Sequence, residues 1–241
     1  MKTWNRKALG IAILSAIAVA AQGDVVLYDN SETQIGDVLN FPNAQEIGDQ
    51  IYLANYAADP YLTGFSFEYY SPNLSFSGTV TADVRFYLNN GTLFNGYASP
   101  SNLFYHTGPF PIPTPLSVYP GTNSAVLTFS QADLYADAAQ NLNPSMQMPS
   151  NFTVSVTIQG LSGSDSVGLN NFEPPAVGSN HGDYWYNNGG SWELLTFGNS
   201  EPYAFGMQFT ATTQPVPEPA TLCMTLAGAA LLVGFARRRR Q

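Results

Sequence analysis

Few residues of this 241-residue chain have the types and spacing that chemistry requires. His106 and His181 are its only imidazoles, and neither lies in a nucleophile elbow or a His-Glu-x-x-His pattern. His181 and Asp183 could bring two ligands near a metal ion, although a polar loop beside glycine is the commoner meaning of such a segment. We therefore assign no catalytic residue and no metal ligand.

Carboxylates offer two further candidates. Glu173 and Glu193 flank the region of Trp185 and could form the carboxylate pair of a glycan hydrolase, which needs a separation of about 5 to 9 Å across a cleft. A structural Ca²⁺ could take carboxylate oxygens from a set of early aspartates, although their spacing fits no EF-hand loop and no cofactor is predicted. This set is Asp24, Asp29, Asp37 and Asp49.

An aromatic segment around a Gly- and Asn-rich turn is the better binding candidate. Flat rings beside amide side chains suit stacking on, and hydrogen bonding to, sugar rings. Tyr184, Trp185 and Trp192 are therefore candidate glycan contacts, with exopolysaccharide as the ligand. The alternative is that these rings are core residues, as large rings in β-sandwiches usually are.

Charge limits the classes of partner. Residues 24–214 hold 16 of the 17 acidic residues but only one of the eight basic residues, Arg85, so their formal charge is −15. Nucleic acid and anionic lipid would be repelled, whereas divalent cations and neutral glycans would not. Acidity that simply keeps an exported protein soluble is the plainer interpretation.

The elements that must position these residues are predicted to be strands, because apolar residues recur with a period of two. The clearest alternation lies in residues 65–70, 80–88, 152–158 and 203–209. Shorter strands are expected at residues 25–28, 46–53, 103–106, 124–129, 167–169 and 191–197. One short helix, or a loop, is expected within residues 131–142.

Turn residues separate these strands. Residues 89–91 and 187–190 predict tight hairpins, and alternate prolines from Pro109 to Pro115 predict an extended, unpaired crossing loop. Many short strands with little helix indicate an all-β fold, namely an antiparallel two-sheet sandwich of jelly-roll style in a single domain. The only cysteine, Cys223, lies outside that domain, so the domain must fold without an internal disulfide.

Both ends of the chain have the pattern of targeting segments. A basic start and an apolar run at residues 8–19 predict a signal peptide, residues 1–23, for signal peptidase. At the other end, an apolar run at residues 220–236 would form a helix of roughly 26 Å, enough to just cross a membrane. The arginines Arg237, Arg238, Arg239 and Arg240 follow it. Positive charge outside both runs places residues 24–214 on the far side of the membrane.

The tail, residues 215–241, resembles the PEP-CTERM tail that exosortase-type membrane transpeptidases recognise. The resemblance rests on Val216, Pro217, Glu218 and Pro219, on the apolar run and on the arginine cluster. It implies export, transient anchoring in the inner membrane, exosortase processing, and a final place at the cell surface or in the matrix of a biofilm. A permanent, unprocessed anchor is the alternative.

The middle of the chain resembles a recurrent, uncharacterised ectodomain of PEP-CTERM proteins. That resemblance implies no activity, and it rests on residues 28–30, 46–51, 67–70, 84–87 and 189–194. The sequence therefore predicts an exported, non-enzymatic envelope or matrix protein. A carbohydrate-binding module and, less favoured, a glycan hydrolase are the alternatives.

Overall fold

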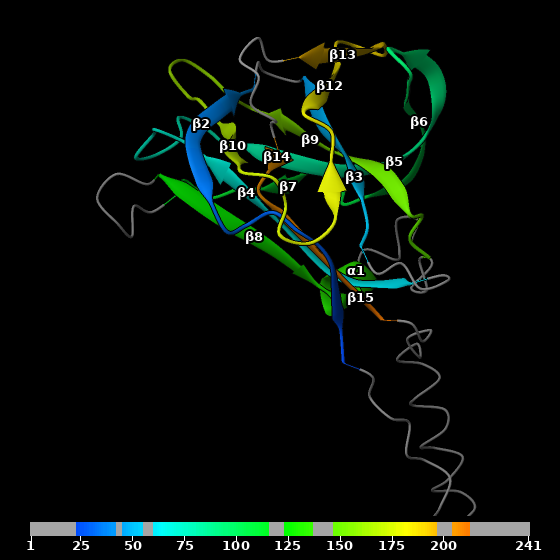
Figure 1. Cartoon of the computed structure of the whole chain (residues 1–241). Coiled ribbons are helices and arrows are strands. Elements are labelled where there is room, and N and C mark those ends of the chain that lie inside the picture. The colour runs from blue at the N-terminus through cyan, green and yellow to red at the C-terminus, as the bar shows by residue number, and fades with distance from the viewer. Residues whose placement is uncertain are drawn as a thin grey trace, which may run out of the picture.

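The computed structural model describes residues 23–41, 45–54, 60–115, 123–136, 147–196 and 204–212. This part of the chain forms two antiparallel β-sheets packed face to face (Figure 1). The sorting motif, the predicted terminal helices and all of the predicted signal peptide except Gly23 lie outside the described residues. Among the residues that are described, no helix has the length and apolar character needed to span a membrane.

The first sheet contains the strands from both ends of the domain. Its main path runs β1 (Val25–Asp29), β15 (Met207–Thr212), β4 (Tyr61–Tyr70), β10 (Gly168–Phe172) and β14 (Ala204–Phe205). In addition, β8 (Ser124–Ser130) pairs with β4, and β2 (Gln34–Asn40) pairs with β10. The strand nearest the C-terminus, β15, thus lies between β1 and β4.

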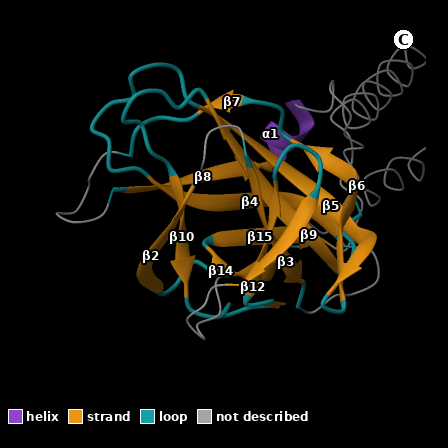
Figure 2. Cartoon of the chain, turned by 90° about the horizontal axis from the view of Figure 1, so that it is seen from above, coloured by secondary structure: helices purple, strands orange, loops and turns teal. Residues whose placement is uncertain are grey.

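The second sheet is built around β9. Its path runs β13 (Trp192–Thr196), β12 (Asp183–Asn187), β3 (Glu46–Tyr52), β9 (Asn151–Gln159), β5 (Thr81–Phe94) and β6 (Tyr97–His106). Two short strands extend it, since β11 (Ser179–Asn180) pairs with β3 and β7 (Phe110–Pro111) pairs with β5. Figure 2 shows the strands of the two sheets overlying one another.

The core lies between the sheets and is rich in aromatic rings. In β9, alternate residues from Phe152 to Ile158 are buried in the core, as a period of two requires. Phe65 of the first sheet packs edge-to-face on Phe86 of the second at 5.2 Å between ring centroids, and Phe209 packs similarly at 5.5 Å from Phe86. These contacts stabilise the domain in place of disulfides.

The expected sandwich is confirmed, and every expected strand has a counterpart, whereas jelly-roll connectivity stays a prediction. Four strands were not expected, namely β2, β7, β11 and β12. Of the helix expected within residues 131–142, the structure describes α1 (Gln131–Ala136), and residues 137–142 lie outside the description. The Asp133 carboxylate accepts hydrogen bonds from the Ser130 backbone N–H and hydroxyl, which caps the start of α1.

Two predictions about connections were wrong. The expected turn at residues 89–91 is part of β5, and the chain instead reverses at Asn95 and Gly96, whose φ angles are 50° and 90°. Positive φ at two successive residues suits a two-residue hairpin turn, and an Asn-Gly pair supplies it at little cost. The proline segment is not wholly unpaired either, because Phe110 and Pro111 form β7 at the edge of β5, where proline is tolerated.

The hairpin formed by β5 and β6 curls over the outer face of the second sheet, and we call it the arched hairpin (residues 81–106). Its pairing shifts register at three places, and such irregularities bend and twist a ribbon. In Figure 1 it forms the arc that rises beside β12 and β13. The outer face of the second sheet is therefore partly covered by the sheet's own edge strands.

Candidate functional site

The predicted aromatic site lies on the hairpin of β12 and β13. Its turn follows Asn187, and Gly189 and Gly190 both have positive φ. Tyr184 packs against the core between the sheets, whereas Trp185 and Trp192 lie on the outer face. The structure thus places Tyr184 on the opposite side of the strand from the two tryptophans.

The arched hairpin covers Trp185. Phe94 packs edge-to-face against it at 5.8 Å between ring centroids, and Trp185 is only 1% exposed. Trp192 is half-buried and packs edge-to-face on Tyr87 at 5.4 Å. An exposed pair of tryptophans, as a sugar-stacking platform would need, is not formed. Glycan contact at Trp192 stays a prediction, and Trp185 acts as a packing residue.

An ionic cluster, which we define as Glu46, Asp83 and Arg85, lies on the same outer face. The Arg85 Nε is 2.7 Å from the Asp83 carboxylate, and its Nη1 is 3.3 Å from the Glu46 carboxylate. Glu46 and Asp83 both pair in register with Thr157, so β9 runs between the two carboxylates. Arg85 lies two positions after Asp83 in β5, opposite Ser155, and its guanidinium contacts both carboxylates.

Neutral groups complete this cluster. The Ser155 hydroxyl donates to Glu46 at 2.5 Å, and the Asn187 amide donates to it at 3.2 Å. Although burial alone would lower the pKa of Arg85, the charges of Asp83 and Glu46 raise it. Burial, followed by the charge of Glu46, raises the pKa of Tyr87. The charged groups of the cluster therefore bond to one another and to neighbouring polar groups, and the carboxylates already neutralise the charge of the Arg85 guanidinium. This arrangement suits a structural role.

Sequence reasoning identified Arg85 as the only cation of residues 24–214 but not its partners. That isolation was the available signal, because a lone, partly buried cation is expected to be paired. Glu46 lies 39 positions away along the chain, and no spacing rule connects the two. The strand register alone brings them together.

Both histidines take part in local contacts. The His106 Nδ1 accepts a hydrogen bond from the Gly108 N–H at 3.2 Å and lies 3.7 Å from the Asp83 carboxylate. The His181 Nε2 lies 2.6 Å from the Tyr52 hydroxyl, and Tyr97 packs on the His181 ring at 4.1 Å. Burial lowers the pKa of His181, while the charge of Asp183 acts in the opposite direction.

The predicted carboxylate pair is split between the sheets. Glu173 directly follows β10 of the first sheet, and Glu193 lies in β13 of the second. Glu173 donates its backbone N–H to the Thr33 carbonyl. A hydrolytic role for the two residues together stays a prediction.

The four early aspartates are likewise dispersed. Asp29 accepts hydrogen bonds from Ser31 and Gln208, whereas Asp49 is buried and accepts one from Asn180. Asp37 lies in β2, and Asp24 precedes β1. Within the described ranges, no three His, Cys, Asp or Glu side chains gather as a metal site would require.

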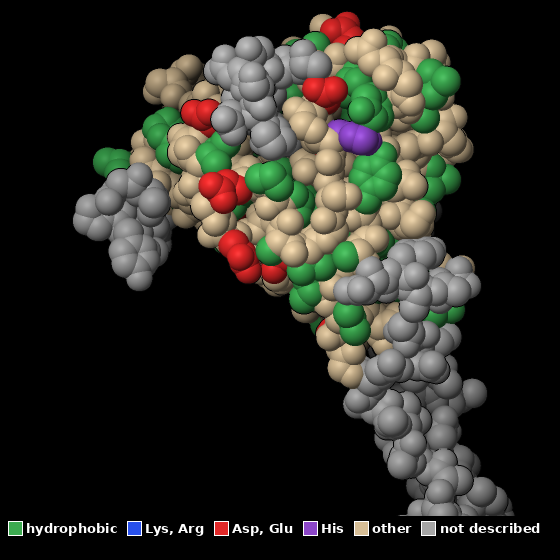
Figure 3. All heavy atoms as spheres, viewed as in Figure 1, with side chains coloured by type: hydrophobic (Ala, Val, Ile, Leu, Met, Phe, Trp, Pro, Cys, Tyr) green, Lys and Arg blue, Asp and Glu red, His purple; other side chains and the backbone are tan. Residues whose placement is uncertain are grey.

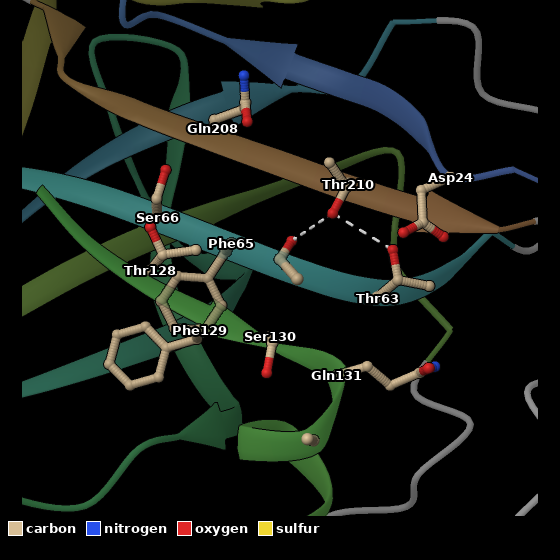
Figure 4. Close-up of a pocket in the computed structure, with 12 residues that line it drawn as sticks. Asp24, Thr63, Phe65, Ser66, Thr128, Phe129, Ser130, Gln131, Gln208 and Thr210 are labelled. Carbon is tan, nitrogen blue, oxygen red and sulfur yellow. Dashed lines mark hydrogen bonds between the residues drawn. The ribbon is translucent and has the colours of Figure 1, made fainter.

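A groove on the outer face of the first sheet was not predicted. It has a volume of about 450 Å³, and its lining combines apolar surface with hydroxyl and amide side chains from β4, β8, β15 and α1 (Figure 4). The Thr63 hydroxyl lies 3.3 Å from that of Thr210, which also donates to the Gly64 carbonyl at 3.2 Å. Asp24 lies at one end of the groove, as the close-up shows.

The chemistry of this groove suits a neutral, hydroxylated ligand. Among the described residues that line it, the groove has one carboxylate, that of Asp24, and no basic side chain. The Gln131 amide nitrogen is buried and makes no hydrogen bond among the described residues. Figure 3 shows dispersed Asp and Glu side chains and no Lys or Arg among the coloured atoms of the face that it draws.

The comparisons with known proteins concern the tail. The PEP-CTERM protein-sorting motif matches residues 215–240. No curated protein and no solved structure matches the chain. The match covers Val216 to Pro219 and Arg237 to Arg240, which lie outside the described residues. The chain therefore carries a PEP-CTERM protein-sorting motif, which supports an exported protein sorted by an exosortase-type system.

Proposed function

We propose that residues 24–214 form a non-enzymatic component of the cell envelope or extracellular matrix, with a structural or adhesive role. In this proposal the signal peptide directs export, and the tail holds the protein in the inner membrane until an exosortase-type transpeptidase processes it. The protein then resides at the cell surface or in the matrix. Delivery rests on the sorting motif at residues 215–240.

One observation supports the structural role: the ionisable side chains best placed for chemistry make contacts within the fold. Arg85 is bonded to both Glu46 and Asp83, which are almost fully buried. His181 contacts Tyr52, and His106 accepts from Gly108. A catalytic acid or base needs access to a substrate proton, and groups bound in this way favour a structural role.

The sorting step is tested with Glu218→Ala in a host that carries an exosortase. This change leaves the apolar run and the arginines intact, so it should trap a full-length, membrane-bound form, while the wild type loses its tail. Intact mass and cell fractionation measure both. Neutral residues in place of Arg237 to Arg240 should instead weaken retention before cleavage. Wild-type protein that keeps its tail, with Glu218→Ala indistinguishable from it, would show a permanent anchor.

The structural role is tested by complementation of a strain that lacks the chain. A structural component acts in proportion to its amount, so cohesion of the matrix should rise steadily with expression level. The double variant Glu173→Gln/Glu193→Gln should restore cohesion as well as the wild type does. Full restoration at trace expression, lost in the double variant, would indicate an enzyme.

Binding of neutral polysaccharide is the second candidate, and the groove of Figure 4 favours it. Its hydroxyl and amide groups can exchange hydrogen bonds with sugar hydroxyls, and the absence of a cation from its described lining disfavours anionic ligands. This position differs from the predicted site at Tyr184, Trp185 and Trp192. The groove and the two tryptophans lie on the outer faces of different sheets, whereas Tyr184 packs against the core.

Affinity electrophoresis of the full chain in gels containing galactomannan or hydroxyethylcellulose distinguishes these positions. If the groove binds, Ser66→Ala/Thr128→Val should abolish retardation, and Trp192→Ala should leave it unchanged. The reverse result would place the site at Trp192. Equal mobility of the wild type with and without polysaccharide would exclude binding of these two polymers.

A further inference from the structure

The edge strand β8 is unusual among the edges of this domain. It pairs with β4 over all seven of its residues without a register shift, and its other edge pairs with no described strand. It contains neither a charged residue nor a proline. Val126, at its middle, is 59% exposed.

The register fixes which backbone groups point outward. The Ser71 N–H donates to the Asn123 carbonyl, so these two residues form a hydrogen-bonded pair of the antiparallel ladder. Every second pair from there along β4 and β8 is hydrogen-bonded in the same way. Ala125, Leu127 and Phe129 therefore direct their backbone groups toward β4. The backbone groups of Ser124, Val126 and Thr128 point away from β4 and form a hydrogen-bonding edge that no other described strand occupies.

Four other described edges have the devices that prevent edge pairing. The β1 edge has a bulge and is occupied, because Asp29 bonds with Val177 and the Leu27 carbonyl accepts from Ala54. The β2 edge has a register shift and contains Asp37. The β13 edge is short and contains Glu193. Pro100 and three register shifts interrupt β6.

We propose that β8 is an interaction surface for a second copy of this chain, with the two β8 strands pairing antiparallel across a two-fold axis. Antiparallel pairing of one strand with its own copy is isologous, so each strand supplies the donors and acceptors that the other needs. The first sheets of the two copies then form one continuous sheet.

Charge favours a second copy over a charged partner. The seven residues of β8 carry no ionisable side chain, whereas residues 24–214 have a formal charge of −15. A basic partner would be drawn to the acidic faces of the domain rather than to this neutral edge. Two copies repel each other over most of their surfaces, and this edge lets them meet without placing like charges in contact. Pairing should therefore strengthen as salt screens the repulsion.

The test is the mass of the full chain in mild detergent, measured by sedimentation at 20 mM and 500 mM NaCl. We expect concentration-dependent dimers that increase with salt. Val126→Lys places a charge at the edge and should give monomers under all conditions. Val126→Pro removes an outward N–H while leaving the bonds to β4, and it should have the same effect. The circular dichroism spectrum of each variant should match the wild type.

Leu74→Lys is the matched control, because Leu74 is 93% exposed and lies outside every strand. It makes the same change of charge and should still dimerise. A wild type that stays monomeric at both salt concentrations would overturn the proposal. Dimers that persist in both Val126 variants would do the same and would point to another contact, such as the tail. If both Val126 variants lose the wild-type spectrum, a Ser124→Lys variant that folds and dimerises would also overturn it.

Discussion

The Asn180 side-chain amide donates a hydrogen bond of 3.1 Å to the carboxylate of Asp49, which is 1% exposed in the middle of β3. Burial raises the pKa of Asp49 well above its usual range, and hydrogen bonds from Asn180 and the backbone only partly offset this. Tyr28 is buried nearby, and its pKa is raised by its burial and then by the charges of Asp49 and Asp29. An acidic group thus lies inside the sandwich, and no cation among the described residues neutralises it.

Asp49 should make the domain less stable as pH rises. Because its folded-state pKa lies above its unfolded value, the folded chain holds the proton more firmly. Stability should therefore fall from about pH 4 upward, through the folded pKa, by up to about 1.4 kcal/mol per pH unit. Asp49→Asn should flatten this decline in thermal unfolding measured from pH 4 to 8.

Asp133→Asn is the control for that experiment. Hydrogen bonds from Ser130 lower the pKa of Asp133, so its contribution has the opposite sign and is lost as pH falls. Its variant should keep the decline toward alkaline pH. An unchanged decline in Asp49→Asn would contradict the role assigned to Asp49.

Removal of the Arg85 guanidinium should destabilise the domain strongly. Arg85→Met leaves Glu46 and Asp83 buried without a cation, and a broken ion pair of this kind costs about 3 kcal/mol. Urea unfolding followed by tryptophan fluorescence would measure the loss. Arg85→Lys keeps the charge but not the forked geometry, so it should lose less. A loss below about 0.5 kcal/mol in Arg85→Met would mean that solvent already screens the cluster.

The pKa of His181 should lie below 6.5, the ordinary value of a histidine side chain, because burial disfavours the imidazolium. A folded-state pKa below the unfolded value means that His181 destabilises the fold as pH falls through the unfolded pKa. The titration is followed by NMR of the ring carbon-bound protons. Asp183→Asn removes a charge that favours the imidazolium and should lower the pKa further. A rise in that variant would refute the assignment.

Gly206→Ala should destabilise the junction of β14 and β15. A Cβ there would lie 2.4 Å from the Phe172 ring, so the ring would have to move. Overpacking of this kind costs about 1 to 3 kcal/mol. Gly78→Ala, at a site with open space around it, is the control. Equal melting temperatures for the two variants would show that Phe172 yields freely.

The strands were predictable where apolar and polar residues alternate, as in β9, although both faces of β9 are buried: alternate residues from Phe152 to Ile158 supply the apolar face, and Thr153, Ser155 and Thr157 supply a polar face that is also covered. The strand β12 was not predictable, since Tyr184, Trp185 and Tyr186 are all large rings and show no alternation. Trp185 is buried under the arched hairpin, while Tyr184 faces the core. Because both faces of this hairpin are covered and carry large rings, its sequence lacks the contrast between apolar and polar positions on which strand prediction depends.

The sorting motif could be predicted from the sequence, whereas the sites within the domain could not. Pro217 and Glu218 could be recognised because a sorting motif is contiguous in sequence. The ionic cluster with its neutral partner Ser155, and the groove of Figure 4, each draw residues from three or more separate elements. Such sites follow from strand order and register, which composition and periodicity leave open.

The position of β15 between β1 and β4 determines when the domain can fold during export. Val25 pairs with Ala211, so the first strand to emerge on the far side of the membrane stays without its neighbour until the last one arrives. Contacts this distant in sequence form slowly. We therefore expect the chain to cross the membrane unfolded. The first sheet should be completed only when the sorting tail reaches the membrane.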